Sequence, residues 1–397
     1  MQATTRMKSR FHGMAAALIV WIAFLASSAA LAQDASLQRW DRATAGALLA
    51  YIERIDSHGL KPANYEPAQL EHAIASGDAL ALERQATRSF ALVAGDLAIG
   101  RVKPGNRGRY YITPNTLHPD EAARLIETAI ASRQDAGTLE SLAPAGREYR
   151  LLRQALGRLD ASQAEERRRI EVNLDRLRWL PRALGARHIL VNIPEFRLRL
   201  VEGGQEISSH RVIVGTTRTP TPQFSTEVRA VILNPPWNVP QSIIAESVGS
   251  LVRNRPSEAR RRGYTWTSAA GRLQVTQQPG PNNALGQLRL DMPNPLSIFI
   301  HDTPNKDLFE REVRTFSHGC IRTQNPFDLA EKLLAGTSWT RAAIDRTVAG
   351  GATTRAPLPQ PVPVYVVYLT AMPGADGSVV YFDDPYKLDA EIAAQLD

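Results

Sequence analysis

The stretch "SHGCIR" at residues 317–322 contains the only cysteine of the 397-residue chain. Cys320 directly follows His318 and Gly319, so a thiol, an imidazole and a permissive backbone position are neighbours in sequence. The possible roles of this single thiol depend on the compartment in which the chain works, because paired cysteines commonly become disulfides outside the cytoplasm.

The N-terminus has the three-part pattern of a secretory signal peptide. Three basic residues precede the apolar run "AAALIVWIAFLASSAA", and "ALA" at 30–32 precedes the polar residue Gln33. We expect residues 1–32 to be a signal peptide and the mature chain to work in the periplasm or cell envelope. The run is shorter than the roughly 20 apolar residues of a membrane span. An uncleaved anchor is the alternative, and it is the one way in which we expect the chain to contact a membrane.

An unpaired thiol in an exported protein indicates either an intermolecular bond or a reactive group. The alternative is a buried cysteine that acts as a small apolar filler. The formal net charge of +7 falls to about +4 without the signal peptide, which suits an anionic polymer but excludes little. In the arginine-rich stretch "EERRRIEVNLDRLRWL" at 165–180, acidic residues alternate with the basic ones. This pattern favours a solvated helix face over a nucleic-acid site, and we expect no nucleic-acid partner.

Residues 34–181 are predicted to form a helical domain. Apolar residues recur at helical spacing after Asp41, a plausible N-cap, and again between Leu82 and Leu97. The same pattern predicts further helices near 119–133, 147–157 and 162–180, the last of which ends at Pro181.

Near residue 187 the spacing of apolar residues changes from the helical period to a pattern typical of strands. Short runs rich in Val, Ile, Leu and Tyr, broken by Gly, Pro and Asn, predict a sheet or small barrel. We therefore assign an α+β fold, with the helical domain followed by a β-rich domain at 187–372 and a C-terminal hairpin and helix extension at 373–397. Residues 239–295 form a long, turn-rich segment between two predicted strands. We interpret this segment as an inserted lid. A solvated surface insertion is the alternative.

A thiol attacks as the thiolate, so a nearby histidine that accepts its proton would activate it. His301 ends the apolar strand "LSIFI" and is the better candidate for this base, because a sheet can aim its side chain. His318 more plausibly supports the loop, and Ser317 would hydrogen-bond within the same turn. Gly319 lets backbone N–H groups near Cys320 approach an oxyanion.

A metal site is a weaker alternative. His301, His318 and Cys320 are all possible zinc ligands, but structural zinc sites usually contain several cysteines at tight spacing. The sequence therefore favours a site without metal or cofactor.

These residues resemble a known family. "HDTP" from His301 followed by "SHGCIR" is similar to the signature of L,D-transpeptidases with a YkuD-type catalytic domain. The segments "VNIPEFRL", "RVIVGTTRTPTPQFS", "VILNPPWNVPQSI" and "GPNNALG" extend the resemblance across residues 173–335 to the large periplasmic, YcbB-like members. "GLKPANY" and "GDLAIGRVKP" are similar to their scaffold domain. Residues 105–172 show no match to the peptidoglycan-binding module of many relatives.

The resemblance implies a peptidoglycan L,D-transpeptidase whose partners are stem peptides. Cys320 would attack the carbonyl of the third residue of a tetrapeptide, D-alanine would leave with a proton from His301, and an amine of a neighbouring stem would form a 3-3 cross-link. Arg322 would position a substrate carboxylate or brace the loop, and Trp237 and Asn238, at the root of the lid, would help to bind the substrate. Carbapenems are the expected covalent inhibitors.

Two other functions stay open on the sequence alone. Water could replace the acceptor amine, which would make the chain an L,D-carboxypeptidase on the same stems. The chain could also be a non-catalytic cell-wall scaffold protein with a site that forms no thioester.

Overall fold

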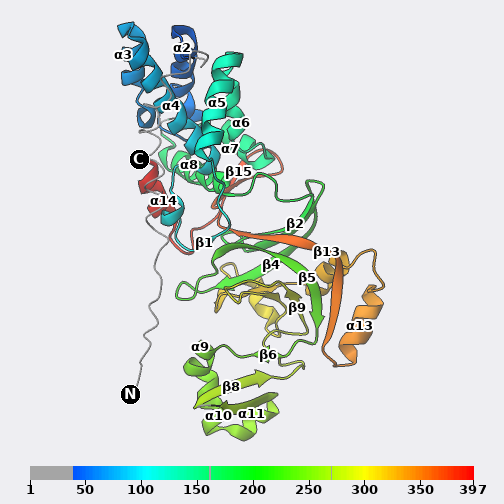
Figure 1. Cartoon of the computed structure of the whole chain (residues 1–397). Coiled ribbons are helices and arrows are strands. Elements are labelled where there is room, and N and C mark those ends of the chain that lie inside the picture. The colour runs from blue at the N-terminus through cyan, green and yellow to red at the C-terminus, as the bar shows by residue number, and fades with distance from the viewer. Residues whose placement is uncertain (1–38, 161, 270) are drawn as a thin grey trace, which may run out of the picture. The chain divides into compact units, whose positions relative to one another are not determined.

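The computed structural model describes residues 39–160, 162–269 and 271–397. The predicted signal peptide, residues 1–32, lies outside these residues. Within them, no helix is both long and apolar enough to cross a bilayer. The chain divides into two compact units (Figure 1): one holds the described residues through Arg101 together with Thr116–Ala145, and the other holds Val102–Asn115 and Gly146–Asp397.

The first unit is helical. Its helices are α2 (Arg42–Ile52), α3 (Pro67–Ser76), α4 (Ala79–Ile99), α5 (Pro119–Ser132) and α6 (Asp135–Leu142), with 3-10 turns at Ile55–His58 and Pro62–Tyr65. Asp41 caps α2 as predicted. Its carboxylate accepts from the Thr44 N–H at 2.7 Å, and the Thr44 hydroxyl accepts from the Asp41 N–H. Apolar residues of α4, such as Phe90 and Val93, are fully buried.

The second unit contains a large mixed sheet. Its strands are β1 (Tyr110–Tyr111), β2 (Arg187–Asn192), β3 (Arg197–Glu202), β4 (Gln205–Gly215), β5 (Gln223–Leu233), β9 (Leu288–Asp291), β10 (Ile300–His301), β11 (Thr315–Ser317), β12 (Ile321–Thr323) and β13 (Thr354–Val367). The strand order is β1-β5-β13-β2-β3-β4-β12-β10-β9, and β9 also pairs with β5. This last pairing closes the strands from β5 through β9 in that order into a barrel-like ring, and β1 pairs with β5 beside it.

Helices accompany the sheet in the same unit. They are α7 (Arg147–Leu156), α8 (Ala164–Trp179), α12 (Pro326–Leu333), α13 (Arg341–Ala349) and α14 (Asp389–Leu396), and the hairpin strands β14 (Ala371–Pro373) and β15 (Val379–Tyr381) precede α14. The predicted α+β class is confirmed. The predicted boundary at 181–187 does not follow the packing, because α7 and α8 group with the β-rich part.

An insertion between β5 and β9 forms its own small layer. The N–H of Asn234 donates to the Gln287 carbonyl at 2.8 Å and closes its neck, so the insertion spans 235–286. It contains β6 (Trp237–Asn238), α9 (Gln241–Ile243), a π-helical turn (Ile244–Val248), α10 (Gly249–Asn254), α11 (Pro256–Arg261), β7 (Tyr264–Ala269) and β8 (Arg272–Gln277). Figure 1 shows its helices around β6 and β8, and a separate apolar cluster that includes Val252 and Val275 holds them together.

The predicted limits of the insertion, 239–295, need correction at both ends. β6 already belongs to the insertion, whereas β9 belongs to the main sheet. In β9 the buried residues Leu288 and Leu290 alternate with the partly exposed Arg289 and Asp291. This alternation is a strand signal, but four residues after a turn-rich segment are too few to stand out.

Candidate active site

Two short parallel strands bring the segments that carry the predicted nucleophile and base side by side. In the pairing of β10 with β12, Ile300 lies opposite Ile321 and His301 lies opposite Arg322. Ile300 and Ile321 are fully buried in the core. Because side chains alternate across a sheet, His301 and Arg322 lie on the other face, and Cys320 directly precedes β12, two residues before Arg322.

Cys320 is half-buried. Its Sγ lies 3.9 Å from the carbonyl oxygen of Ser297. Burial raises the pKa of the thiol, although the backbone N–H of Phe299 and the charge of Arg322 act in the opposite direction. The resting group is therefore a thiol at neutral pH, and attack requires a base that removes its proton.

His301 is a buried, neutral imidazole. Only 4% of its surface is exposed, and its Nδ1 lies 2.5 Å from the carbonyl oxygen of Asp302. A carbonyl can only accept, so Nδ1 carries the proton and Nε2 keeps its lone pair. Burial, together with the charge of Arg322, lowers the pKa of His301 to about 4. The ring is therefore in the form that can accept a proton at physiological pH.

Side-chain and backbone contacts hold the loop before Cys320. The Ser317 hydroxyl donates to the Cys320 carbonyl at 2.5 Å and accepts from the Gly319 N–H at 3.1 Å. The Ser317 carbonyl in turn accepts from the Thr216 N–H at 2.9 Å. Ser317 thus supports the turn from within. The N–H of Cys320 itself donates to no acceptor in the described part of the chain.

Gly319 has a backbone conformation that favours glycine. Its φ is +110°, and a Cβ there would lie 3.1 Å from Cδ1 of Ile298. We expect Gly319→Ala to lower the free energy of unfolding by about 1–3 kcal/mol. Because the loop must shift to hold the added Cβ, the variant should also react with a carbapenem at Cys320 at least about tenfold more slowly than the wild type.

Gly351→Ala is the matched control for Gly319→Ala. Gly351 also has a positive φ, +75°, but no atom lies within 4 Å of its added Cβ. The control should lose stability without losing acylation. Equal acylation rates in the Gly319 variant and the wild type, measured beside urea denaturation, would contradict the role assigned to this turn.

His318 contacts the insertion. Its Nε2 lies 2.9 Å from Oε2 of Glu246 in the π-helical turn, and both side chains are about half exposed. This contact joins the loop before Cys320 to the insertion, and the support role of His318 stays a prediction. Within the described residues, no group of three or more His, Cys, Asp or Glu side chains is arranged to hold a metal ion.

The three predicted substrate-binding residues lie in two places. Arg322 is beside His301, and burial lowers its pKa. Trp237 and Asn238 form β6 at the start of the insertion, where Trp237 packs on the insertion's apolar cluster and Asn238 accepts from the Thr276 hydroxyl at 3.0 Å. The structure thus brings Arg322 to the site, whereas the contacts of Trp237 and Asn238 are within the insertion.

Sequence reasoning missed Asp302, which follows His301. Its carboxylate accepts from the Gln287 N–H at 2.9 Å, pairs with Lys306, and is only 4% exposed. A Cβ at Gly286 would lie 2.3 Å from this carboxylate, so glycine is required there. Asp302 is part of the motif "HDTP", and Gly286 is the last glycine of "GPNNALG". Neither motif indicates that these two residues are in contact in the fold.

Comparison with known proteins identifies the class. Residues 186–349 match the family model YkuD, the L,D-transpeptidase catalytic domain, and residues 38–156 match the model of the Scaffold domain. A Haemophilus influenzae protein with the provisional name L,D-transpeptidase is 30% identical over 283 residues, which are 67% of this chain and 57% of that protein. The chain therefore contains a YkuD-type L,D-transpeptidase catalytic domain and a Scaffold domain, and the resemblance of its motifs to that catalytic domain is confirmed.

Solved structures of the same family also match. An L,D-transpeptidase from Mycobacterium smegmatis matches with 13% identity and a TM-score of 0.26, over 46% of this chain and 58% of its own. An Enterococcus faecium L,D-transpeptidase matches with 12% identity and a TM-score of 0.23, over 46% of this chain and 50% of its own.

Proposed function

We propose that the chain is an exported L,D-transpeptidase that forms 3-3 cross-links in peptidoglycan through a thioester on Cys320. The observation that supports this proposal most is the parallel pairing of β10 and β12, which brings the strand with the buried imidazole of His301 beside the strand that directly follows the half-buried Cys320. The family match supports the choice of peptidoglycan stem peptides as substrate.

In the first half-reaction, Sγ of Cys320 bonds to the carbonyl carbon of the third stem residue while its proton passes to His301. The bond from that carbon to the nitrogen of D-alanine breaks, and His301 gives the proton to the leaving amine. In the second half-reaction, an amine of a neighbouring stem attacks the thioester. Its proton returns through His301 to the departing thiolate, which restores the thiol without a cofactor.

The N–H of Cys320 is well suited to hold the oxyanion of the tetrahedral intermediate. It has no acceptor in the described part of the chain, whereas the neighbouring Gly319 N–H and Cys320 carbonyl are both bonded to Ser317. A fixed donor aimed at developing charge commonly raises the rate of such a step by a factor of about 100 to 1,000.

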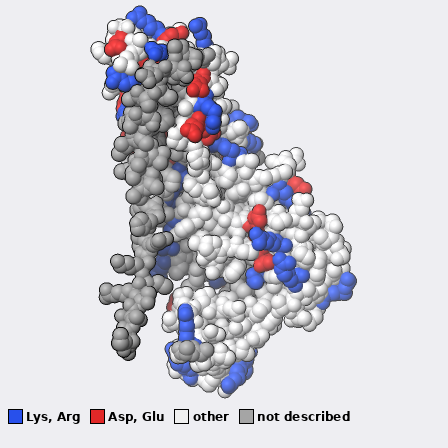
Figure 2. Space-filling view, in the orientation of Figure 1, with Lys and Arg blue, Asp and Glu red and all other residues white. Residues whose placement is uncertain are grey.

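The charge of the insertion suits an acidic substrate. Arginine side chains gather over α10 and α11 (Figure 2), at positions 253, 255, 260, 261 and 262. Glu258 pairs with Arg255 and Arg262, and Arg260 stacks on Trp266 with 5.0 Å between the guanidinium carbon and the ring centroid. Peptidoglycan stems carry free carboxylates, so this surface favours their approach.

The test is muropeptide analysis of purified sacculi after incubation with the mature protein. We expect dimers joined between the third residues of two stems, with release of D-alanine. Stems shortened to tripeptides without dimers would identify a carboxypeptidase instead. Unchanged muropeptides, with the protein bound to the sacculi, would overturn the enzyme assignment and favour a scaffold protein.

A further inference from the structure

Tyr386 lies in the loop between β15 and α14, in the C-terminal extension. Its ring stacks on that of Tyr368 at the end of β13, with centroids 5.6 Å apart and an interplanar angle of 27°. The N–H of Tyr386 donates to the Tyr368 hydroxyl at 2.9 Å. The ring stacking and this backbone hydrogen bond together fix the position of the Tyr386 ring.

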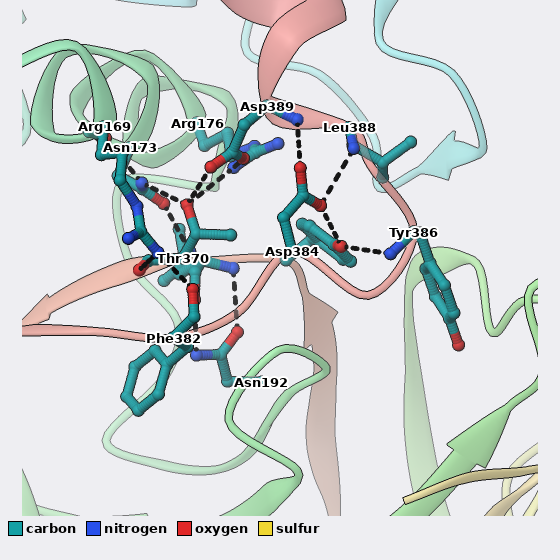
Figure 3. A network of polar contacts seen from close by, with 12 residues as sticks. Arg169, Asn173, Arg176, Asn192, Thr370, Phe382, Asp384, Tyr386, Leu388 and Asp389 are labelled. Carbon is teal, nitrogen blue, oxygen red and sulfur yellow. Dashed lines mark hydrogen bonds and ion pairs between the residues drawn. The ribbon is translucent and has the colours of Figure 1, made fainter. Parts of the chain in front are cut away.

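A polar network anchors this loop (Figure 3). The carboxylate of Asp384 accepts from the Tyr368 hydroxyl and from the N–H groups of Leu388 and Asp389, each of the latter at 2.9 Å. Asp389 in turn pairs with Arg176 of α8 at 2.5 Å. The extension is therefore fixed to α8 and to the end of the sheet.

The hydroxyl of Tyr386 points away from this network (Figure 3) and ends at the neck of a short loop. It donates to the Gly215 carbonyl at 2.7 Å and accepts from the Thr221 N–H at 3.2 Å. Gly215 and Thr221 already lie close, since a Cβ on Gly215 would be 2.7 Å from the Thr221 nitrogen. The Tyr386 hydroxyl thus joins the two ends of the loop 216–220.

Thr221 carries the connection to the candidate active site. It is 3% exposed, and its hydroxyl accepts from the Gly215 N–H at 2.9 Å and donates to the Gly319 carbonyl at 2.9 Å. The peptide between Gly319 and Cys320 is planar and trans. Fixing its carbonyl oxygen therefore also fixes the opposite direction of the Cys320 N–H.

We propose that Tyr386 is a positioning residue that acts through Thr221 to aim the Cys320 N–H at the oxyanion. This inference rests on the proposed function. It gives the C-terminal extension a part in orienting the oxyanion donor.

The test compares two reactions of Cys320. Acylation by a carbapenem passes through an oxyanion, whereas alkylation by iodoacetamide displaces iodide at carbon and needs no oxyanion donor. Tyr386→Phe keeps the stacked ring and removes the hydroxyl. Thr221→Val removes the hydroxyl at nearly constant shape, and Thr221→Ser restores it. Tyr381→Phe is the matched control, because Tyr381 lies in the same extension and its ring contacts Arg169 instead.

We expect acylation to slow about tenfold in Tyr386→Phe and about 100-fold in Thr221→Val. Thr221→Ser and Tyr381→Phe should stay within about threefold of the wild type, and alkylation should change less than about twofold in all four. Since both residues act through one contact, the double variant of Tyr386→Phe and Thr221→Val should be no slower than Thr221→Val alone.

Each result separates the two proposals. Wild-type protein that is never acylated at Cys320 overturns the proposed function. Acylated wild type with an unchanged rate in Tyr386→Phe and Thr221→Val overturns the positioning role alone. Equal slowing of acylation and alkylation also overturns it, because that pattern describes a loosened loop and not a misdirected donor. Melting temperatures establish that each variant is folded.

Discussion

Alanine in place of Cys320 should abolish 3-3 cross-linking of purified sacculi. The thiol supplies the atom that bonds to substrate, and removal of a covalent nucleophile commonly costs a factor of about 10⁴ or more. The fold should persist, because the side chain is small, half-buried and outside the core cluster. We expect the melting temperature to change by no more than a few degrees.

The control for Cys320→Ala is Cys320→Ser, which keeps the size of the side chain and replaces the thiol by a far weaker nucleophile. It should be as inactive as the alanine variant and as stable as the wild type. Dimers that still form with Cys320→Ala, measured by muropeptide analysis, would exclude a thioester on this residue.

The second large effect concerns His301 and pH. The rate of acylation in dilute carbapenem reports the pKa of the free protein's base. Because the pKa of His301 lies at about 4, the imidazole stays unprotonated well below the ordinary histidine value of about 6.5. We expect the rate to hold from neutral pH down to about pH 5 and to fall below that, as protonation removes the acceptor.

His301→Asn should slow acylation by a factor of about 100 to 10,000 at neutral pH. It should also remove the fall in the acylation rate at low pH, which we call the acid limb. His72→Asn, at an exposed histidine of α3 in the first unit, is the control and should leave the profile unchanged. A wild-type acid limb centred near pH 6.5 or above would contradict the buried, neutral imidazole.

Much of the helical architecture could be predicted from the sequence. The helices predicted at 119–133 and 162–180 correspond to α5 and α8, because long amphipathic segments bounded by proline carry a strong periodic signal. Short elements in polar surroundings, such as β9 and the insertion strands, were missed. The grouping of α8 with the sheet depends on tertiary contacts, including the bond from Asn173 to the Thr370 hydroxyl at 2.8 Å, which no local pattern shows.

The candidate site shows the same division. Cys320 and His301 were predicted from residue type and context, whereas the closeness of their segments depends on the parallel pairing of two very short strands. Trp237 was predicted near the substrate, but its packing is within the insertion. Thr221 and Tyr386 are single polar residues in loops, so their roles arise only when the fold brings them to Gly319.

Intact mass spectrometry after incubation with a carbapenem tests the central claim most directly, namely that a base on β10 activates the thiol beside β12. We expect wild-type protein to gain the mass of one drug molecule, mapped by peptide analysis to Cys320, and His301→Asn to gain it far more slowly. A wild-type protein that keeps its mass, or a His301→Asn variant that is acylated at the wild-type rate, would contradict the account.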